Sequence, residues 1–425
     1  MAYAHRALEQ QEAGPGVWRV VGPDAPAPLR GMVARGLAPL PPRDLLIALY
    51  QIWVSNDPDL ATVASKTLEG LPPAILNGAL DDATLPAGVL DLLGRKLPRN
   101  TDVLERVVRH RQVDDETLAG IARVCPDAVC DVLADNQERW MRHPAIVESL
   151  YQNPNCRMSV VHRMLEFAVR ENIDVRLPNM DEIRTALLEE SAPQPERDDL
   201  FKRATVGLQD THAKVIETFQ NAAVGDEVDL DAVRVEAGGS VDVLDLEAMF
   251  AQSAVDDLSL PMDEANLDLD LPLDEAVQQA AAAVAEKATG GQGLFFIISR
   301  MNPMEKMRMA LLGGAFERFV LVRDSNKAVA MSAIKSPKVN DNEVMGYAAN
   351  RTLARDVVTY ISKRREWTKN YAITLNLVLN PKTPMATAMG FLVRLHPHDV
   401  KKVAFSKNIP SALATAARRK LEQRR

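Results

Sequence analysis

Two stretches of the chain decide the fold: WMRHPAIVESLYQNPNCRM at residues 140–158 and WTKNYAITLNLVLNPKTPM at residues 367–385. Each begins with Trp, continues into an apolar run and reaches an Asn-Pro pair. Identical residues stand at matched positions in both: Trp140, Ala145, Ile146, Leu150, Asn153, Pro154, Met158 and Leu165 recur as Trp367, Ala372, Ile373, Leu377, Asn380, Pro381, Met385 and Leu392. Upstream, Val113, Asp115, Gly120 and Ala122 recur as Val339, Asp341, Gly346 and Ala348. The chain therefore contains an internal duplication with an offset of 226 to 227 residues.

The regions around both stretches have the pattern of short amphipathic helices. In residues 41–168 and 300–425, apolar residues recur at helical spacing, and short polar connections that place Asn or Ser beside Pro separate the runs. The alternation typical of strands is nearly absent. The runs predict, among others, helices over 72–80, 86–94, 101–110, 114–122 and 126–134 in the first region, and over 303–312, 327–335, 341–349 and 369–379 in the second. The sequence therefore predicts an all-α fold.

A shorter repeat is visible within the second region. Pro337-Lys338 recurs as Pro381-Lys382, and Met345-Gly346-Tyr347 recurs as Met389-Gly390-Phe391, which gives a period of 44 residues. A period in this range is typical of HEAT-like repeats, whose units must stack to bury their apolar faces. We therefore expect two HEAT-like α-solenoid modules.

Two short motifs carry a resemblance to known proteins: Glu366-Trp367-Thr368-Lys369-Asn370-Tyr371 and Asn380-Pro381-Lys382-Thr383-Pro384. Through them the chain resembles a group of uncharacterised bacterial α-helical-repeat proteins. These are similar to HEAT and leucine-rich-repeat-variant arrays, whose units end in Asn-Pro-x-Thr-Pro. The resemblance covers residues 41–170 and 300–425; it implies a helical-repeat fold and no particular activity. The cysteine cluster of some variant-repeat proteins is missing, so no iron–sulfur centre is implied.

A segment of different composition separates the two modules. Residues 226–275 contain 16 acidic residues and one basic residue, whereas residues 300–425 contain 24 Lys and Arg against 9 Asp and Glu. High charge and scarce aromatic residues predict disorder over most of the segment, with helix expected over 198–222 and in the Ala-rich run 276–285. We expect four parts: an N-terminal extension 1–40, a first helical-repeat module 41–188, an acidic and Ala-rich linker 189–296, and a second, basic module 297–425.

Residue types that carry catalysis or bind metals do not occur in a supporting pattern. The three cysteines, Cys125, Cys130 and Cys156, lack the second close pair of a metal site. We expect buried structural thiols, with a metal or redox role as the alternative. Neither a phosphate-binding loop nor a nucleophile motif is present. The sequence therefore predicts no enzymatic activity, no cofactor and no metal; a HEAT-like enzyme acting on DNA bases is a weaker alternative.

The cellular compartment follows from similar observations. The longest apolar runs, such as residues 45–54, are much shorter than the ~20 residues that span a bilayer, and residues 1–16 hold no apolar signal core. Few cysteines are typical of a reducing compartment. We expect a cytoplasmic protein that does not insert into membranes.

The basic second module carries the clearest indication of function. Equivalent helix ends align on one edge of a stacked array, so its clustered cations are expected to form a partner-binding stripe: Lys363, Arg364, Arg365, Lys369, Lys401, Lys402, Lys407, Arg418, Arg419 and Lys420. Such a stripe suits an acidic protein partner, including the chain's own linker, or nucleic acid and other polyanions. A solvated surface that aids solubility is the third interpretation. Trp140 and Trp367 are expected to fill joints between adjacent helical pairs, with ligand stacking as the alternative.

These observations favour a non-enzymatic scaffold or adaptor that binds protein partners. Residues 241–275 interleave Asp with Leu, Val, Met and Phe, and acidic segments of this type often fold on binding to a groove. We expect this segment to dock on the basic module and to compete there with an external partner. Binding of nucleic acid or another polyanion by the second module is the alternative, and its steep dependence on salt would distinguish it.

Overall fold

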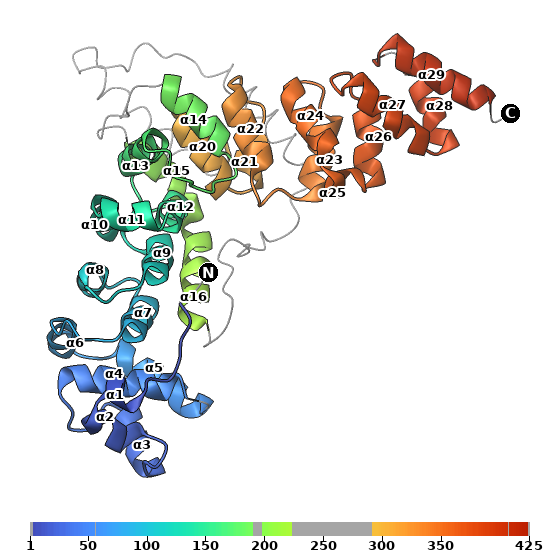
Figure 1. Cartoon of the computed structure of the whole chain (residues 1–425). Helices are drawn as coiled ribbons and strands as arrows, with labels where there is room; N and C mark the ends of the chain where they lie inside the picture. The colour runs from blue at the N-terminus through green and yellow to red at the C-terminus, as the bar shows by residue number, and fades with distance from the viewer. Residues whose placement is uncertain (1–2, 56, 190–197, 223–290, 407, 424–425) are drawn as a thin grey trace, which may run out of the picture. The chain divides into compact units, whose positions relative to one another are not determined.

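The computed structural model describes residues 3–55, 57–189, 198–222, 291–406 and 408–423 (Figure 1). Every regular element in these residues is a helix, which confirms the all-α prediction. The helices divide into two compact units: the first contains residues 3–177 and 206–222, and the second contains residues 178–189, 199–205 and 291–423. The disorder predicted for the acidic linker and the helix predicted for its Ala-rich run concern residues that lie outside the described ranges.

The first unit begins with three short helices, α1 (Gln10–Ala13), α2 (Pro15–Val21) and α3 (Ala27–Ala34), and continues with helices in two rows (Figure 1). Successive members of each row pack against one another. We call one row the front row; it consists of α4 (Pro42–Trp53), α7 (Ala87–Lys96), α9 (Asp115–Val124) and α12 (Ala145–Gln152). We call the other row the back row; it consists of α6 (Pro73–Leu80), α8 (Thr101–Arg109), α10 (Asp127–Asp135) and α13 (Met158–Arg170). In addition, α5 (Pro58–Glu69) packs against α4, and α11 (Gln137–Arg142) packs against α12.

Local sequence explains where many of these helices begin. Asn100 and Asp114 precede α8 and α9, and their side chains accept hydrogen bonds from the first-turn N–H groups of Val103 (3.2 Å) and Glu116 (2.9 Å). Such caps satisfy donors that have no partner within the helix. Proline stands in the first turn of α4, α5 and α6, where its missing N–H costs nothing. The short helices that the sequence predicts therefore form within two residues of their expected bounds.

The Asn of each duplicated Asn-Pro motif makes the same contacts in its own unit. In the first unit, the side-chain amide of Asn153 donates to two carbonyls at the end of α9, those of Ala122 and Cys125 (both 2.9 Å). In the second unit, the amide of Asn380 donates to two carbonyls at the end of α23 (Asp341–Ala349), those of Ala348 and Asn350 (both 2.9 Å). Each Asn thus satisfies the last carbonyls of the preceding front-row helix. This motif therefore has a structural role in both copies.

The second unit contains a front row that corresponds to that of the first. By the duplication, α23 is the counterpart of α9; it packs against α26 (Tyr371–Leu379), and α26 packs against α28 (Pro397–Phe405). Behind these helices, α22 (Lys327–Lys335) packs against α24 (Arg355–Lys363), and α27 (Met385–Arg394) packs against α29 (Ser411–Glu422). The remaining described helices from residue 291 onward are α19 (Gly291–Arg300), α20 (Pro303–Leu312), α21 (Ala315–Leu321) and α25 (Arg365–Thr368).

The repeat length in the second unit differs from the prediction. Its front-row helices begin at Asp341, Tyr371 and Pro397, which are 30 and 26 residues apart. The 44-residue period expected from the sequence matches the end of α22 with the end of α26, and these helices belong to different rows. The period of 44 residues is therefore wrong, because similar helix ends occur in both rows of the unit.

Three helices, one at the end of the predicted first module and two in the predicted linker, are divided between the two units. In the second unit, α14 (Met180–Glu189) packs on α20 and α22, with an ion pair between Glu182 and Lys335 (2.8 Å). The ring of Phe201, in α15 (Asp198–Thr205), lies 4.6 Å from the guanidinium of Arg308. After a short 3-10 turn (Val206–Leu208), α16 (Gln209–Asn221) belongs to the first unit. Residues 198–222 are thus helical, as predicted, but their two helices belong to different units.

Candidate interaction surfaces

The front row of the first unit is covered by an amphipathic helix from the linker region. Helix α16 packs against α7 and α9, and Figure 1 shows it running alongside the front row. Its buried side chains are His212, Val215, Ile216 and Phe219, the i, i+3, i+4, i+7 spacing that places residues on one helix face. The last three form an apolar cluster with Val124 of α9. The front row of this unit therefore accepts the apolar face of an amphipathic helix.

A glycine in α9 makes room for the largest side chain of α16. A Cβ atom added at Gly120 would stand 2.9 Å from the ring of Phe219, closer than carbon atoms can approach without displacement. On the other side, the guanidinium of Arg95 lies 5.4 Å from the centre of the same ring, within the range of a cation–π contact. The Nζ of Lys96 donates to the carbonyl of Gln220 in the last turn of α16, where a cation is favourable for the helix dipole. The apolar cluster, the contacts of the Phe219 ring and the Lys96 hydrogen bond together hold α16 on the front row.

His212 is the first of the four buried side chains of α16 and holds the beginning of this helix in place. Its Nε2 lies 3.1 Å from the side-chain amide nitrogen of Asn155, which follows α12. Burial, and then the positive charge of Arg123, lower the pKa of His212 to about 4. The neutral imidazole is thus the form that fits, because protonation would place an additional charge in a buried site. The sequence predicted a helix over residues 198–222 but not the surface that Val215, Ile216 and Phe219 cover.

The N-terminal segment also contacts the front row, through His5 and helix α7. His5 Nε2 lies 2.9 Å from a carboxylate oxygen of Asp91 in α7. The same carboxylate accepts hydrogen bonds from Arg95 and from the hydroxyl of Thr117 (2.7 Å). Burial raises the pKa of Asp91, but the His5 hydrogen bond and the charge of Arg95 outweigh it, so its pKa lies below the ordinary value. Asp91 is therefore held as a carboxylate that joins the N-terminal segment to the front row.

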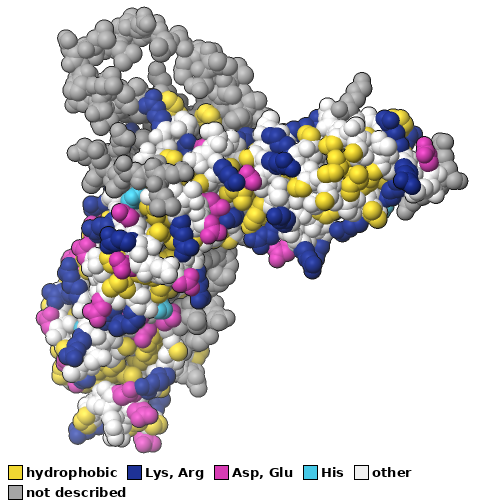
Figure 2. Space-filling model, turned by 45° about the horizontal axis from the view of Figure 1, so that its top comes forward, with side chains coloured by type: hydrophobic (Ala, Val, Ile, Leu, Met, Phe, Trp, Pro, Cys, Tyr) yellow, Lys and Arg dark blue, Asp and Glu magenta, His cyan; other side chains and the backbone are white. Residues whose placement is uncertain are grey.

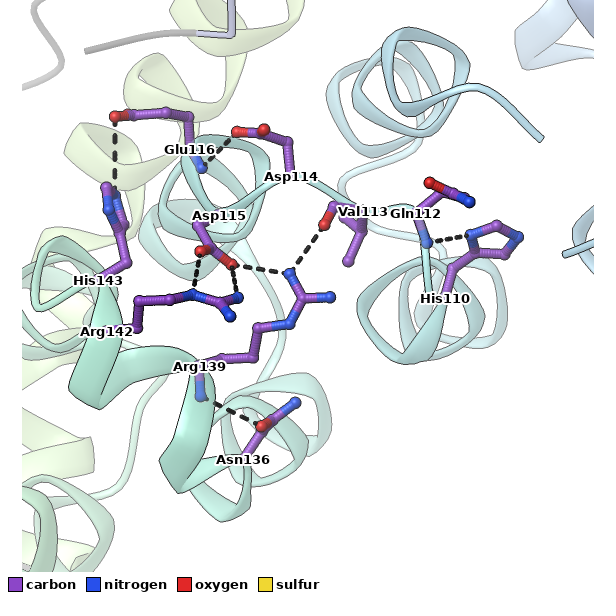
Figure 3. A network of polar contacts seen from close by, with 10 residues as sticks. All are labelled: His110, Gln112, Val113, Asp114, Asp115, Glu116, Asn136, Arg139, Arg142 and His143. Carbon is purple, nitrogen blue, oxygen red and sulfur yellow. Dashed lines mark hydrogen bonds and ion pairs between the residues drawn. The ribbon is translucent and has the colours of Figure 1, made fainter. Parts of the chain in front are cut away.

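The polar contacts in Figure 3 hold α9 and α11 together. Asp115, at the start of α9, accepts hydrogen bonds from Arg139 (2.7 Å) and Arg142 (3.0 and 3.2 Å) of α11. Arg139 also donates to the carbonyl of Val113 (2.8 Å). Helix α11 is short and was not predicted; this network and Trp140 account for its position. The indole of Trp140 is buried, donates to the carbonyl of Ala134 (3.0 Å) and packs edge-on against Phe167, which agrees with the structural role expected for it. Trp367 is only half-buried.

In the second unit, hydrophobic side chains lie in a band with Lys and Arg at its borders and few acidic residues (Figure 2). The large exposed hydrophobic residues of this unit include Met345 (36% exposed) in α23 and Phe405 (68%) in α28, both front-row helices. Two others, Met385 (37%) and Val393 (71%), lie in α27. Exposed apolar side chains among cations are typical of a surface that binds another chain.

The ten cationic residues expected to form one stripe are distributed over different parts of the second unit. Lys363 to Arg365 and Lys369 surround the short helix α25, Lys401 and Lys402 lie within α28, Arg418 to Lys420 lie near the end of α29, and Lys407 is outside the described residues. Several of them have structural contacts: Arg364 with Tyr360, Lys402 with Asp399, and Arg418 and Lys420 with backbone carbonyls. Among the described residues, no hydrogen-bond or ion-pair partner occurs for the side chains of Lys363, Arg365, Lys369, Lys401 and Arg419.

The three cysteines are buried, as expected, and the sulfur atoms of Cys125 and Cys130 lie 3.5 Å apart without a disulfide. Within the described ranges, no group of three His, Cys, Asp or Glu side chains is arranged to hold a metal ion. Among the same residues, no helix has the length and apolar composition to cross a membrane.

Comparison of the chain with protein-family models, with curated proteins and with solved structures gives no match.

Proposed function

We propose that this protein is a non-enzymatic adaptor whose front-row helices bind amphipathic helices of protein partners. The observation that carries the proposal is the seating of α16 on α7 and α9 of the first unit. The surface offers an apolar cluster, a position where glycine admits an aromatic ring, and a lysine at the end of the bound helix. A helix that supplies Phe and two aliphatic residues on one face fits these features. Recognition of this kind is common among helix-in-groove complexes.

In this proposal α16 occupies the site until a partner helix replaces it. The two would compete for the same contacts, and α16 has the advantage of being tethered to the unit that it covers. Stacked helical pairs are suited to this role because they present a continuous surface to an extended ligand, and we interpret the two units as α-solenoid modules. Buried thiols that form no disulfide are compatible with the reducing environment of the cytoplasm, where we place the protein.

The test uses a labelled peptide of residues 206–222 and the full chain with Phe219→Asp, in which the site is vacated. We expect the peptide to bind this chain, and the additional change Gly120→Leu to weaken binding by at least about ten-fold, equivalent to ~1.4 kcal/mol, because the new side chain fills the space of the Phe ring. Gly390→Leu is the matched control, since a Cβ atom there meets no other atom within 4 Å. Absence of binding would mean that α16 is only a part of the fold.

The second part of the proposal concerns regulation. The acidic linker carries charge opposite to that of the second unit, whose residues from 300 to 425 contain 24 cations and 9 acidic residues. We propose that the linker docks on this unit and limits access of an external partner. The tether favours such docking, because it keeps the linker at a high local concentration.

A second candidate function is binding of nucleic acid or another polyanion by the second unit. This function is supported by the five cations whose side chains have no partner among the described residues: Lys363, Arg365, Lys369, Lys401 and Arg419. We expect that affinity of the full chain for a labelled DNA duplex, if this function is correct, decreases with salt with a logarithmic slope of about −0.9 for each phosphate contacted. Changing Lys363, Arg365 and Lys369 to Glu should abolish binding. In the control, three exposed cations of the first unit, Arg35, Lys66 and Arg111, are changed to Glu, so that the net charge changes by the same amount. Equal loss in both variants, or no binding, would exclude this function.

A further inference from the structure

The duplication makes α23 and α26 of the second unit the counterparts of α9 and α12, and a described helix, α16, covers the outward face of α9. In α9 the outward positions are Glu116, Ala119, Gly120 and Arg123. The duplication and the spacing of the front-row helices assign their counterparts in the second unit: Asn342, Met345, Gly346 and Ala349 in α23; Ala372, Leu375, Asn376 and Leu379 in α26; His398, Lys401, Lys402 and Phe405 in α28. Each set has the i, i+3, i+4, i+7 spacing of one helix face. We call the three sets in the second unit the open face.

Burial differs between the two faces in the way expected for a covered and an uncovered site. In α9 of the first unit, on which α16 packs, Ala119 and Arg123 are only 7% and 9% exposed. Their counterparts in α23, Met345 and Ala349, are exposed. A helix that is apolar on all sides is normally buried on all sides. The middle helix of the open face, α26, has the sequence YAITLNLVL, yet Ala372, Leu375 and Leu379 on its outward side are only half-buried.

The charge of the open face identifies the kind of helix that fits it. Lys401 and Lys402 stand beside Phe405 on α28, and both are exposed. The outward positions of the three helices include no acidic residue. A ligand for this face must therefore present apolar side chains on one side and carboxylates beside them, since a cationic helix would be repelled.

Residues 241–250 of the linker, with the sequence VDVLDLEAMF, meet both requirements. Val243, Leu246 and Phe250 have the same spacing as His212, Val215 and Phe219 of α16, so that the Phe stands at the same position of the pattern, and Glu247 stands where α16 has Ile216. Asp242, Asp245 and Glu247 supply the negative charge, and residues 241–250 contain no cation. The 40 residues between Phe250 and the start of α19 in the second unit reach ~130 Å when extended, far more than the ~30 Å width of three adjacent helices.

We propose that residues 241–250 bind the open face of the second unit as an amphipathic helix, so that α23, the counterpart of α9, is covered as α9 is covered by α16. This inference rests on the proposed function, because it assigns the residues and the surface through which the linker regulates the second unit. Phe250 takes the role of Phe219, and the apolar side chains of α23 and α26 contact Val243 and Leu246. Lys401 pairs with a linker carboxylate, while Lys402, which already contacts Asp399, adds positive charge beside it. An external partner for this unit is then an acidic amphipathic helix.

The experiment measures protection of an introduced thiol in the full chain. The three native cysteines are buried, so Met345→Cys provides a reactive thiol on the open face. We expect alkylation of this thiol to be at least about ten-fold slower with the native linker than with a linker carrying Val243→Asp and Phe250→Asp. The reason is that the reagent reaches the thiol only after the docked segment has dissociated from the open face. High salt should increase the rate only in the chain with the native linker.

Val393→Cys provides the matched control. Val393 is 71% exposed and lies on the back-row helix α27, away from the open face, so its alkylation rate should be the same with both linkers. Equal alkylation rates of the Met345→Cys thiol with both linkers would overturn the inference, and so would protection that persists after the two linker changes, because a different segment would then cover the face. The outcome is independent of the peptide-binding test, which concerns the first unit alone.

Discussion

Replacing Phe219 with Asp is expected to release α16 from the first unit. Phe219 is 5% exposed and contacts the α9 surface at Gly120 and the guanidinium of Arg95. Truncation of a buried Phe costs about 3–5 kcal/mol, and a carboxylate without a buried partner adds a desolvation cost. The docked population of α16 should therefore decrease by a factor of about 100 or more. Hydrogen exchange of the α16 amides in the full chain measures this change directly.

Thr218→Asp is the appropriate control for this variant. It introduces the same charge at the neighbouring residue of the same helix, but Thr218 faces solvent. We expect exchange of the α16 amides to remain close to that of the native chain in this control. If both variants exchange equally fast, the buried contact of Phe219 does not hold α16, and a general loss of helix stability explains the result.

Replacing Glu343 with Ala is expected to destabilise the second unit by about 3–5 kcal/mol, because it leaves a buried cation without its partner. Glu343 and Arg318 are 3% and 4% exposed and form a two-point ion pair (2.8 and 2.9 Å) between α23 and α21. The hydroxyl of Tyr347 also donates to Glu343 (3.2 Å). Burial, and then the negative charge of Glu343, raise the pKa of Tyr347 well above its ordinary value. Hydrogen exchange of the α21 and α23 amides should report the loss.

Two further variants separate this explanation from others. Glu366→Ala removes an exposed carboxylate of α25 and should change stability by less than about 0.5 kcal/mol. The double variant Arg318→Met with Glu343→Leu removes both charges and should recover most of the lost stability, as apolar replacements of buried ion pairs often do. If the double variant is as unstable as Glu343→Ala, the loss arises from packing and not from the uncompensated charge.

The sequence was sufficient to predict most helices, because each is delimited by local signals. Asn100, Asp114 and Asn340 cap helix starts, and Asn-Pro pairs follow helix ends. Helix α11 was not predicted, because it is only six residues long and its position depends on Asp115, far away in the sequence. The 44-residue period was wrong because similar helix ends occur in both rows, and only the packing of α23, α26 and α28 distinguishes them.

The candidate surfaces could be predicted only in part. The sequence indicated a helix over residues 198–222 and a basic second module, and it singled out Gly120 as a residue shared with Gly346. It did not indicate that α16 covers α7 and α9, because that contact joins residues about 100 positions apart, such as Gly120 and Phe219. The cationic stripe was inferred from clusters of Lys and Arg in the sequence, which were expected to lie at helix ends. The structure places Lys401 and Lys402 within α28 and not at its end.

The most direct measurement of the central claim is the affinity of a labelled peptide of residues 206–222 for two full chains, the native one and the Phe219→Asp variant. The proposal that the front row is a helix-binding surface occupied by α16 predicts binding that is at least about ten-fold tighter to the variant, equivalent to ~1.4 kcal/mol, because its surface is vacant. Equal affinities, or no binding to the variant, would contradict the proposal.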